Sequence, residues 1–301
     1  MKRTLLIATA ALLLIVPSCQ KDQDGVYNPK KKISKIVYSG EGLSMQGSYR
    51  ELWKWDGNKF VSRAILYCPP DTTYLYTYSY DGKRLASIIY KDFLNDHYCK
   101  TDFTYDGKYL QQADYYVRGI LRSTAKFTQT DGKITAIDFI YLNLPDGSKG
   151  SFDNNLMLDM LMPLDLQQNE ACQQLKANSK SGELIFKVSI TWDGNNISKM
   201  VWDYDGYIKT NEFTYDNKRN PFCGLGVSWL NDLNEDYYLL GSTFKVFDKN
   251  NILASKYQDI NRNTTESVTY TYTYKGDYPT SCIVKIASDS GTTSYEYEYL
   301  N

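Results

Sequence analysis

A short unit of alternating aromatic residues recurs along most of this 301-residue chain, and it constrains the fold more than any other feature. The unit is an aromatic residue, any residue, a second aromatic residue, a turn containing Asp or Gly, and then Leu or Ile. Its clearest copy is residues 78–85, with the sequence YSYDGKRL. The second aromatic residue, or its equivalent, falls at positions 55, 80, 105, 129, 192, 215, 247 and 274. Such recurrence predicts a repeat architecture.

Each copy predicts a β-hairpin. Residues 76–80 alternate Tyr with Thr and Ser, and this period of two is typical of a half-buried strand. The Asp-Gly pair supplies the positive φ that a tight turn requires. The outgoing arm follows the pattern Leu-x-x-Ile-x-Tyr, as in Leu85, Ile88 and Tyr90. Because its three-residue step breaks the alternation, we expect a β-bulge after most turns.

The two ends of the chain are half-units. Residues 33–38 match an outgoing arm, and residues 295–299 match an incoming arm. With eight hairpins between them the count is 18 strands, although Pro221 interrupts the strand expected after Tyr215. The two ends can pair antiparallel and close the sheet. The sequence therefore predicts an all-β antiparallel meander of about 16–18 strands, closed or nearly closed into a barrel, with an open curved sheet as the alternative.

Two insertions interrupt the repeat. Residues 143–182 contain few β-branched residues, and Asp165 can cap a helix there, so we expect short helices that cover or plug one end of the sheet. Residues 220–241 are rich in apolar side chains. Such a loop is expected either to pack against the barrel or to line a site.

The N-terminus has the features of an export signal. Residues 1–18 combine the basic Lys2 and Arg3 with an apolar stretch at 4–16, which is too short to cross a membrane. Cys19 follows Ser18 in a pattern that resembles a bacterial lipobox, with Pro17 as a departure from it. The resemblance implies a lipid-anchored Cys19, whereas a plain secretory signal is the alternative.

The polar residues after Cys19 indicate which side of the outer membrane the anchored protein faces. Residues 20–24, QKDQD, resemble the signal that sends Bacteroidetes lipoproteins to the cell surface. A periplasm-facing anchor with a plain polar tether is the alternative. The expected organisation is a signal peptide at 1–18, a lipidated Cys and tether at 19–31, and one repeat domain at 32–301.

Composition excludes several classes of protein. A net charge of −1 lacks the basic character of a nucleic-acid binder. The single histidine, His97, is expected in a solvated loop, and no nucleotide, metal or hydrolase motif is found. We therefore expect no cofactor, no metal site and no catalytic residues, with a hydrolase as a minor alternative. Five cysteines besides Cys19 form no CxxC pair, so they are expected to be small buried side chains.

The lipobox and the hairpins together resemble a group of gut Bacteroidetes lipoproteins of unknown function with a porin-like fold. The resemblance covers roughly residues 30–301 and implies a porin-like barrel, but it carries no activity. The Tyr-Asp repeats of large toxin shells are a second, weaker resemblance.

The strand composition favours a tethered, water-exposed barrel over a pore. Tyr dominates one face, Thr, Ser, Lys and Glu the other, and the mean hydropathy is −0.49. We expect a surface module that binds a glycan or a peptide; a structural or partner-protein role in the outer envelope is the alternative. The candidate ligand contacts are the tryptophans: Trp229, Trp53, Trp55, Trp192 and Trp202. All but Trp229 lie at repeat positions, so core packing is the competing interpretation for those four.

Overall fold

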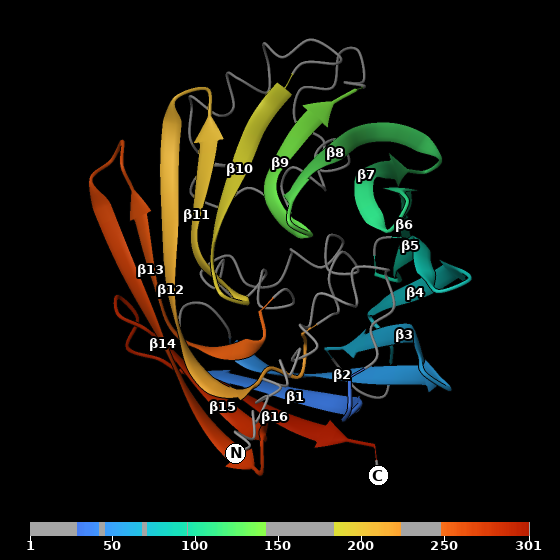
Figure 1. The fold of residues 1–301 in the computed structure, drawn as a ribbon. Helices are drawn as coiled ribbons and strands as arrows, with labels where there is room; N and C mark the ends of the chain where they lie inside the picture. Colours follow the sequence, from blue (N-terminus) through green and yellow to red (C-terminus); the bar gives the residue numbers. More distant parts are fainter. Residues whose placement is uncertain are drawn as a thin grey trace, which may run out of the picture.

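The protein is a closed antiparallel barrel of sixteen strands (Figure 1). The computed structural model describes residues 29–41, 46–67, 71–94, 96–142, 184–223 and 248–300. The strands are β1 (Ile33–Glu41), β2 (Gln46–Asp56), β3 (Lys59–Leu66), β4 (Tyr74–Asp81), β5 (Arg84–Asp92), β6 (His97–Asp106), β7 (Tyr109–Val117), β8 (Ile120–Thr130), β9 (Lys133–Tyr141), β10 (Leu184–Asp193), β11 (Asn196–Tyr204), β12 (Tyr207–Arg219), β13 (Asn250–Asp259), β14 (Thr264–Lys275), β15 (Tyr278–Ile286) and β16 (Thr293–Tyr299).

The barrel closes as the sequence predicts, because β1 pairs antiparallel with β16. Sixteen strands form rather than eighteen because two repeat copies share one hairpin. Strand β12 pairs directly with β13, with Tyr215 opposite Ile252, so residues 216–251 stand where other hairpins have a tight turn. The helices expected at 143–182 lie outside the described residues.

The expected β-bulges are present. Tyr80 lies opposite Leu85 whereas Ser79 lies opposite Ser87, which leaves Ala86 as an extra residue. The same shift follows eight hairpin connections and also occurs where β16 meets β1. The extra residues are Ser34, Val61, Ala86, Gln111, Arg122, Thr135, Ser198, Leu253 and Thr280. The bulge returns Leu85, Ile88 and Tyr90 to one buried face, which explains the three-residue step in the sequence.

The connections divide between the two ends of the barrel. The end that carries the hairpin connections β2–β3, β4–β5, β6–β7, β8–β9, β10–β11, β12–β13 and β14–β15 is termed the turn end, and the opposite end the return end. Strand β1 begins and β16 ends at the turn end. The turn at 81–84 places Gly82 at its first central position with φ 60°, as a type II′ turn requires.

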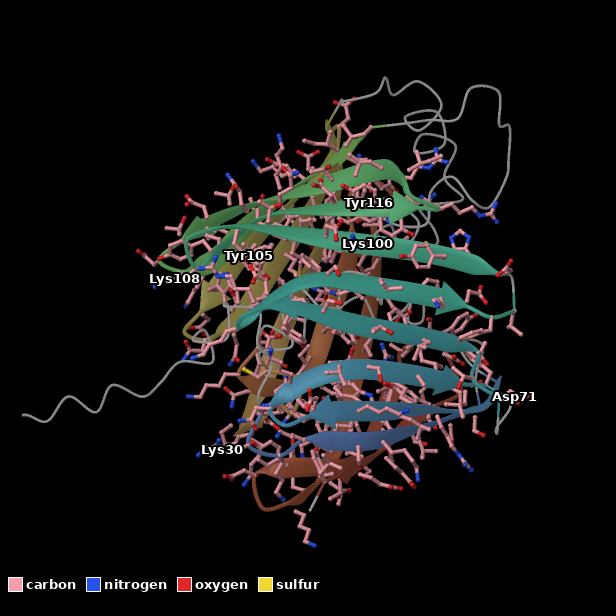
Figure 2. All side chains as sticks on the ribbon, turned by 90° about the vertical axis from the view of Figure 1, so that its right-hand side faces the viewer. Lys30, Asp71, Lys100, Tyr105, Lys108 and Tyr116 are labelled. Atoms are coloured by element: carbon pink, nitrogen blue, oxygen red, sulfur yellow. The ribbon has the colours of Figure 1, made fainter. Side chains whose placement is uncertain are left out.

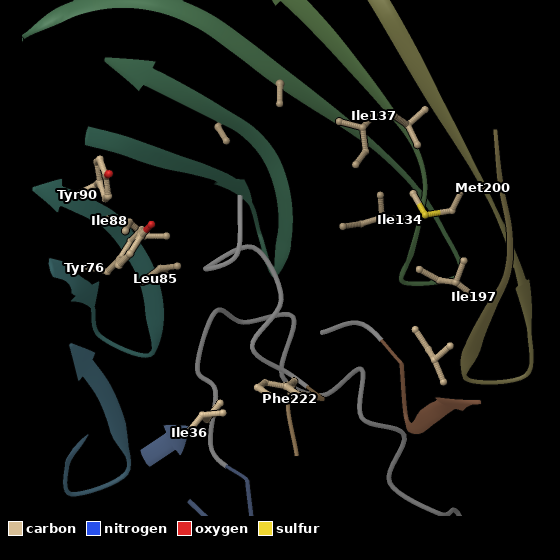
Figure 3. Packing of buried hydrophobic residues seen from close by; sticks show 14 of the residues in the cluster. Ile36, Tyr76, Leu85, Ile88, Tyr90, Ile134, Ile137, Ile197, Met200 and Phe222 are labelled. Atoms are coloured by element: carbon tan, nitrogen blue, oxygen red, sulfur yellow. The ribbon is translucent and has the colours of Figure 1, made fainter. Parts of the chain in front are cut away.

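Aromatic and aliphatic side chains line the inside of the barrel (Figure 3). Tyr76, Tyr78 and Tyr90 are at most 5% exposed, and they join Leu85 and Ile88 in one continuous cluster. Rings on neighbouring strands stack, as for Tyr38 and Tyr49, whose centroids are 4.1 Å apart. Burial of this wall is the main favourable contribution to folding.

The outer wall carries charged side chains between the two ends (Figure 2). Lys199 pairs with Glu212 on the neighbouring strand at 3.0 Å, and Lys100 pairs with Asp102 at 2.9 Å. The hydrogen bond that Lys100 donates to the Asp102 carboxylate raises the pKa of Lys100. A lysine facing lipid at mid-membrane costs about 2–4 kcal/mol. Within the described ranges, no helix has the length and apolar character needed to cross a membrane.

Candidate functional site on the inner wall

A belt of hydrogen bonds at the turn end joins each hairpin to the one before it, except at β14–β15, where Tyr274 donates to the Asp216 carboxylate instead. The side chain just before the turn donates to the backbone carbonyl of the Leu or Ile position after the preceding turn. Tyr80 Oη lies 2.7 Å from Phe60 O, and Tyr105 Oη lies 3.0 Å from Leu85 O. The further pairs are Trp55 with Ile33, Gln129 with Leu110, Trp192 with Ile134, Tyr215 with Ile197 and Tyr299 with Pro279. Each bond reaches the carbonyl just before a bulge.

The belt explains a feature of the repeat that the sequence analysis missed. The second aromatic position holds Trp, Tyr or Gln in every described unit, and each of these side chains can donate a hydrogen bond. The first aromatic position also accepts Phe or Ile, as at Phe103 and Ile190, because it makes no belt hydrogen bond. Restriction of the second position to donors was the signal that could have revealed the belt.

The Tyr80→Phe substitution tests the belt. It removes the hydroxyl that donates to Phe60 O, and we expect a loss of about 1–2 kcal/mol in the free energy of unfolding. Urea denaturation would measure it. Tyr109→Phe is the matched control, because Tyr109 is 40% exposed beside a turn and should change stability by less than about 0.5 kcal/mol. Equal effects of the two substitutions would contradict a structural belt.

An ion pair is buried inside the barrel on β2 and β3. Glu51 is 0% and Arg63 3% exposed. Arg63 donates to both carboxylate oxygens of Glu51, at 2.7 Å from Nε and 2.5 Å from Nη2, and Trp53 Nε1 donates at 2.8 Å. Burial alone would raise the pKa of Glu51, but Arg63 and these hydrogen bonds lower it below its ordinary value. The pair is therefore charged and fully desolvated at neutral pH.

A second buried carboxyl lies where the β12–β13 connection replaces a tight turn. Asp248 is 1% exposed, and its Oδ1 accepts a hydrogen bond of 2.7 Å from the Ile197 amide. Burial raises the pKa of Asp248 to about 8, and the Ile197 amide and Tyr215 hydroxyl oppose this only in part. Asp248 is therefore mostly protonated at neutral pH, unlike Glu51.

A hollow lies in the inner wall beside the β12–β13 connection. Its enclosed space is about 20 Å³, within about 420 Å³ that includes the open solvent at its mouth, and it is lined mainly by aromatic residues of β14 and β16, by Phe222 and by the amides of Asn220 and Asn251. Phe222 is 3% exposed and its ring lies 6.0 Å from those of both Trp53 and Tyr297 (Figure 3). The start of the 220–241 loop therefore packs inside the barrel, and Phe222 also lines the hollow, whereas residues 224–241 lie outside the described residues.

Three cysteines are buried, and one of them contacts the histidine. Cys99, Cys223 and Cys282 are buried, as expected, whereas Cys68 and Cys172 lie outside the described residues. His97 does not sit in a loop: it begins β6, half-buried, with Nε2 3.0 Å from Cys99 Sγ. The two side chains meet because residues two apart on a strand share one face. In the part of the chain that the structure describes, no group of three potential metal ligands is found.

The structure assigns structural contacts to the four repeat tryptophans. Trp53 and Trp202 are 4% and 2% exposed and lie in the core cluster. Trp55 and Trp192 belong to the belt, where each donates to a backbone carbonyl. Trp53 also contacts a residue of the hollow, because its ring packs against Phe222. Trp229 and Cys19 lie outside the described residues.

The fold is a porin-like barrel, and comparisons with known proteins agree. Neither models of protein families nor curated protein sequences match this sequence. A crystal structure of a porin-like protein from Bacteroides uniformis is similar over 92% of this chain and 100% of its own, with a TM-score of 0.52 and 11% identity. A porin-like protein from Bacteroides vulgatus covers 90% of this chain and 99% of its own, with a TM-score of 0.49 and 10% identity. A TcdB2-TccC3 structure covers 80% of this chain and 16% of its own, at a TM-score of 0.26. At such low identity the likeness supports the fold alone.

Proposed function

We propose that this protein is a lipoprotein of the bacterial outer envelope, anchored through Cys19, whose barrel stands in water and binds a glycan or a peptide. The charged outer wall supports a tethered barrel over a pore, because Lys100, Asp102, Lys199 and Glu212 lie where a pore would contact lipid. The barrel thus works beside the membrane and not within it. We infer a surface-facing anchor from residues 20–24, with a periplasm-facing one as the alternative.

The anchor is tested by Cys19→Ser. We expect the wild-type chain to float with membranes and its N-terminal peptide to carry the mass of added acyl chains. The variant should lose the added mass. Lys21→Gln, in the same tether, is the control and should keep it. An unmodified wild-type Cys19 would contradict the anchor, and protease treatment of intact cells would tell a surface-facing from a periplasm-facing barrel.

The hollow is the observation that carries the binding role. Aromatic faces stack on sugar rings, and amides such as Asn251 supply directional hydrogen bonds, which is the chemistry of many small-ligand pockets. Its half-buried Tyr272 lies beside the buried Tyr270 and Tyr297. Nothing comparable is formed by the belt, whose donors are already used.

A glycan array probed with the detergent-solubilised chain tests this role. We expect saturable binding that Tyr272→Ala weakens about tenfold, the equivalent of about 1.4 kcal/mol. Trp229→Ala should also weaken it if the loop beyond Cys223 completes the site. Tyr109→Ala, on the exposed β6–β7 turn, is the control and should leave binding unchanged.

The alternative function is a structural or partner-protein role in the outer envelope with no small ligand. Absence of glycan and peptide binding, together with co-purification of one stoichiometric membrane protein, would favour it. Catalysis is the weakest of the three, because the most deeply buried carboxyl groups are already held by neighbours: Glu51 by Arg63, Asp259 by Lys209, and Asp248 by the Ile197 amide.

A further inference from the structure

The charges of this nearly neutral chain divide between the two ends of the barrel. We counted the described residues of each connection with the strand residue on either side, and included residues 29–32 at the turn end. The turn end has eleven Lys and Arg against seven Asp and Glu, whereas the return end has two against seven. In Figure 2, Lys30 and Lys108 lie at one end and Asp71 at the other. Residues 224–247 add one Lys and three acids to the sequence and are not included.

Contacts with aromatic rings hold several turn-end cations in place. The Lys59 ammonium lies 5.5 Å from the ring centroid of Tyr80, and Arg84 lies 5.7 Å from that of Tyr105. Lys32 lies 5.5 Å from Trp55 and also donates to Gly57 O at 2.6 Å. In each case the cation precedes the carbonyl that accepts the belt hydrogen bond. The repeat therefore builds a basic rim, because the cation–π contact keeps the positive charge.

The tether leaves the barrel at this same end. Ile33 begins β1 beside Tyr299, and Cys19 lies thirteen residues before Lys32. Thirteen residues span about 45 Å when extended and about 20 Å as a random coil. A lipid on Cys19 would therefore keep the turn end, and not the return end, close to the membrane surface.

We propose that the turn end is a membrane-facing surface whose basic rim binds anionic lipid headgroups. This inference rests on the proposed lipid anchor at Cys19 and adds a fixed orientation to it. A lysine near an anionic membrane surface contributes about 1 kcal/mol, so several together orient a tethered protein. The acidic return end is then directed away from the membrane, because like charges repel.

Vesicle binding of an unlipidated chain tests this surface independently of the anchor. The chain is residues 19–301 with Cys19→Ser, exported by a plain secretory signal; it retains all sixteen strands of the closed barrel. Vesicles are phosphatidylcholine alone, or in equal parts with phosphatidylglycerol. We expect co-sedimentation only with the anionic vesicles, weakened by salt.

Two matched variants locate the binding surface. The turn-end variant changes four exposed lysines to Glu: Lys30, Lys83, Lys108 and Lys275. The control changes four exposed lysines of the outer wall in the same way: Lys91, Lys126, Lys256 and Lys285. We expect the turn-end variant to lose about 100-fold or more in apparent affinity, and the control less than about tenfold.

Each outcome decides the question. Loss confined to the turn-end variant supports the surface. Equal loss in both variants, or no binding of the wild-type chain to anionic vesicles, overturns it. If the turn-end variant fails to fold, Lys30→Gln with Lys31→Gln replaces it, since both residues precede β1 and should still weaken binding about tenfold. An unmodified Cys19 in cells would instead contradict the lipid anchor, and it would not change the vesicle-binding result, which uses the unlipidated chain.

Discussion

Glu51→Gln is expected to lower the free energy of unfolding by about 3–5 kcal/mol, because it leaves the Arg63 guanidinium charged inside the barrel without its carboxylate. Arg63→Met should lower the free energy of unfolding by a similar amount, because it leaves the Glu51 carboxylate buried without its guanidinium partner. The double variant should be more stable than either single one, since no buried charge remains and the amide oxygen introduced at position 51 can still accept the hydrogen bond from Trp53. Chemical denaturation of the four proteins gives the coupling energy.

The exposed pair Lys199–Glu212 is the matched control. Glu212→Gln and Lys199→Met should each change stability by less than about 1 kcal/mol. Additive losses from Glu51→Gln and Arg63→Met would contradict a coupled buried pair. Because the folded pKa of Glu51 is lowered, its contribution is present above the unfolded value of 4.5 and is lost as the pH falls through the folded value.

Asp248 is expected to give the opposite pH dependence. Its folded pKa of about 8 lies above the unfolded value of 3.8, so the folded state binds the proton more tightly. The associated stability is fully present below pH 3.8 and is lost as the pH rises through 8, at up to about 1.4 kcal/mol per pH unit. Asp248→Asn should remove this dependence and be clearly more stable than the wild-type protein at pH 9. Thermal unfolding between pH 5 and pH 9 would measure it.

Asp131→Asn is the control for this prediction. Asp131 is exposed in a turn with φ 53°, a conformation that Asn also adopts readily, so its replacement should leave the pH profile unchanged. A wild-type profile that stays parallel to that of Asp248→Asn from pH 5 to pH 9 would show that Asp248 is ionised in the folded state.

The barrel could be predicted from the sequence because its determinants are local. Alternation at 76–80 sets the faces of a strand, Asp-Gly sets the turn, and the step from Leu85 to Ile88 reports the bulge. The half-units at the two ends then predict closure. The β12–β13 hairpin was counted as two hairpins, because its two halves, at Tyr215 and Ile252, are far apart in the sequence and neighbours only in space.

The buried groups of the inner wall could not be predicted in the same way. Glu51 and Arg63 lie 12 positions apart on the two strands of one hairpin. The predicted turn and bulge fix their register, but charged side chains are ordinarily exposed, so the pattern alone does not place them in the core. The protonation of Asp248 depends on its burial beside Ile197, 51 positions away. The tryptophans are candidate ligand contacts because aromatic faces stack on sugar rings. The structure adds a further role for three of them: Trp55 and Trp192 donate hydrogen bonds in the belt, and Trp53 donates one to Glu51.

The junction of β1 and β16 makes the units of the barrel equivalent around the ring. Ile33 faces Tyr299 with an extra residue at Ser34, and Leu300 N donates to Lys32 O at 2.8 Å, so this junction is an eighth hairpin that lacks only its covalent link. A ring of eight equivalent units has no privileged starting point. Circular permutation that joins residue 300 to residue 32 and opens the chain at another Asp-Gly pair would preserve every strand pairing. Loss or duplication of one unit would narrow or widen the ring by two strands, so its circumference could change between relatives in steps of one hairpin.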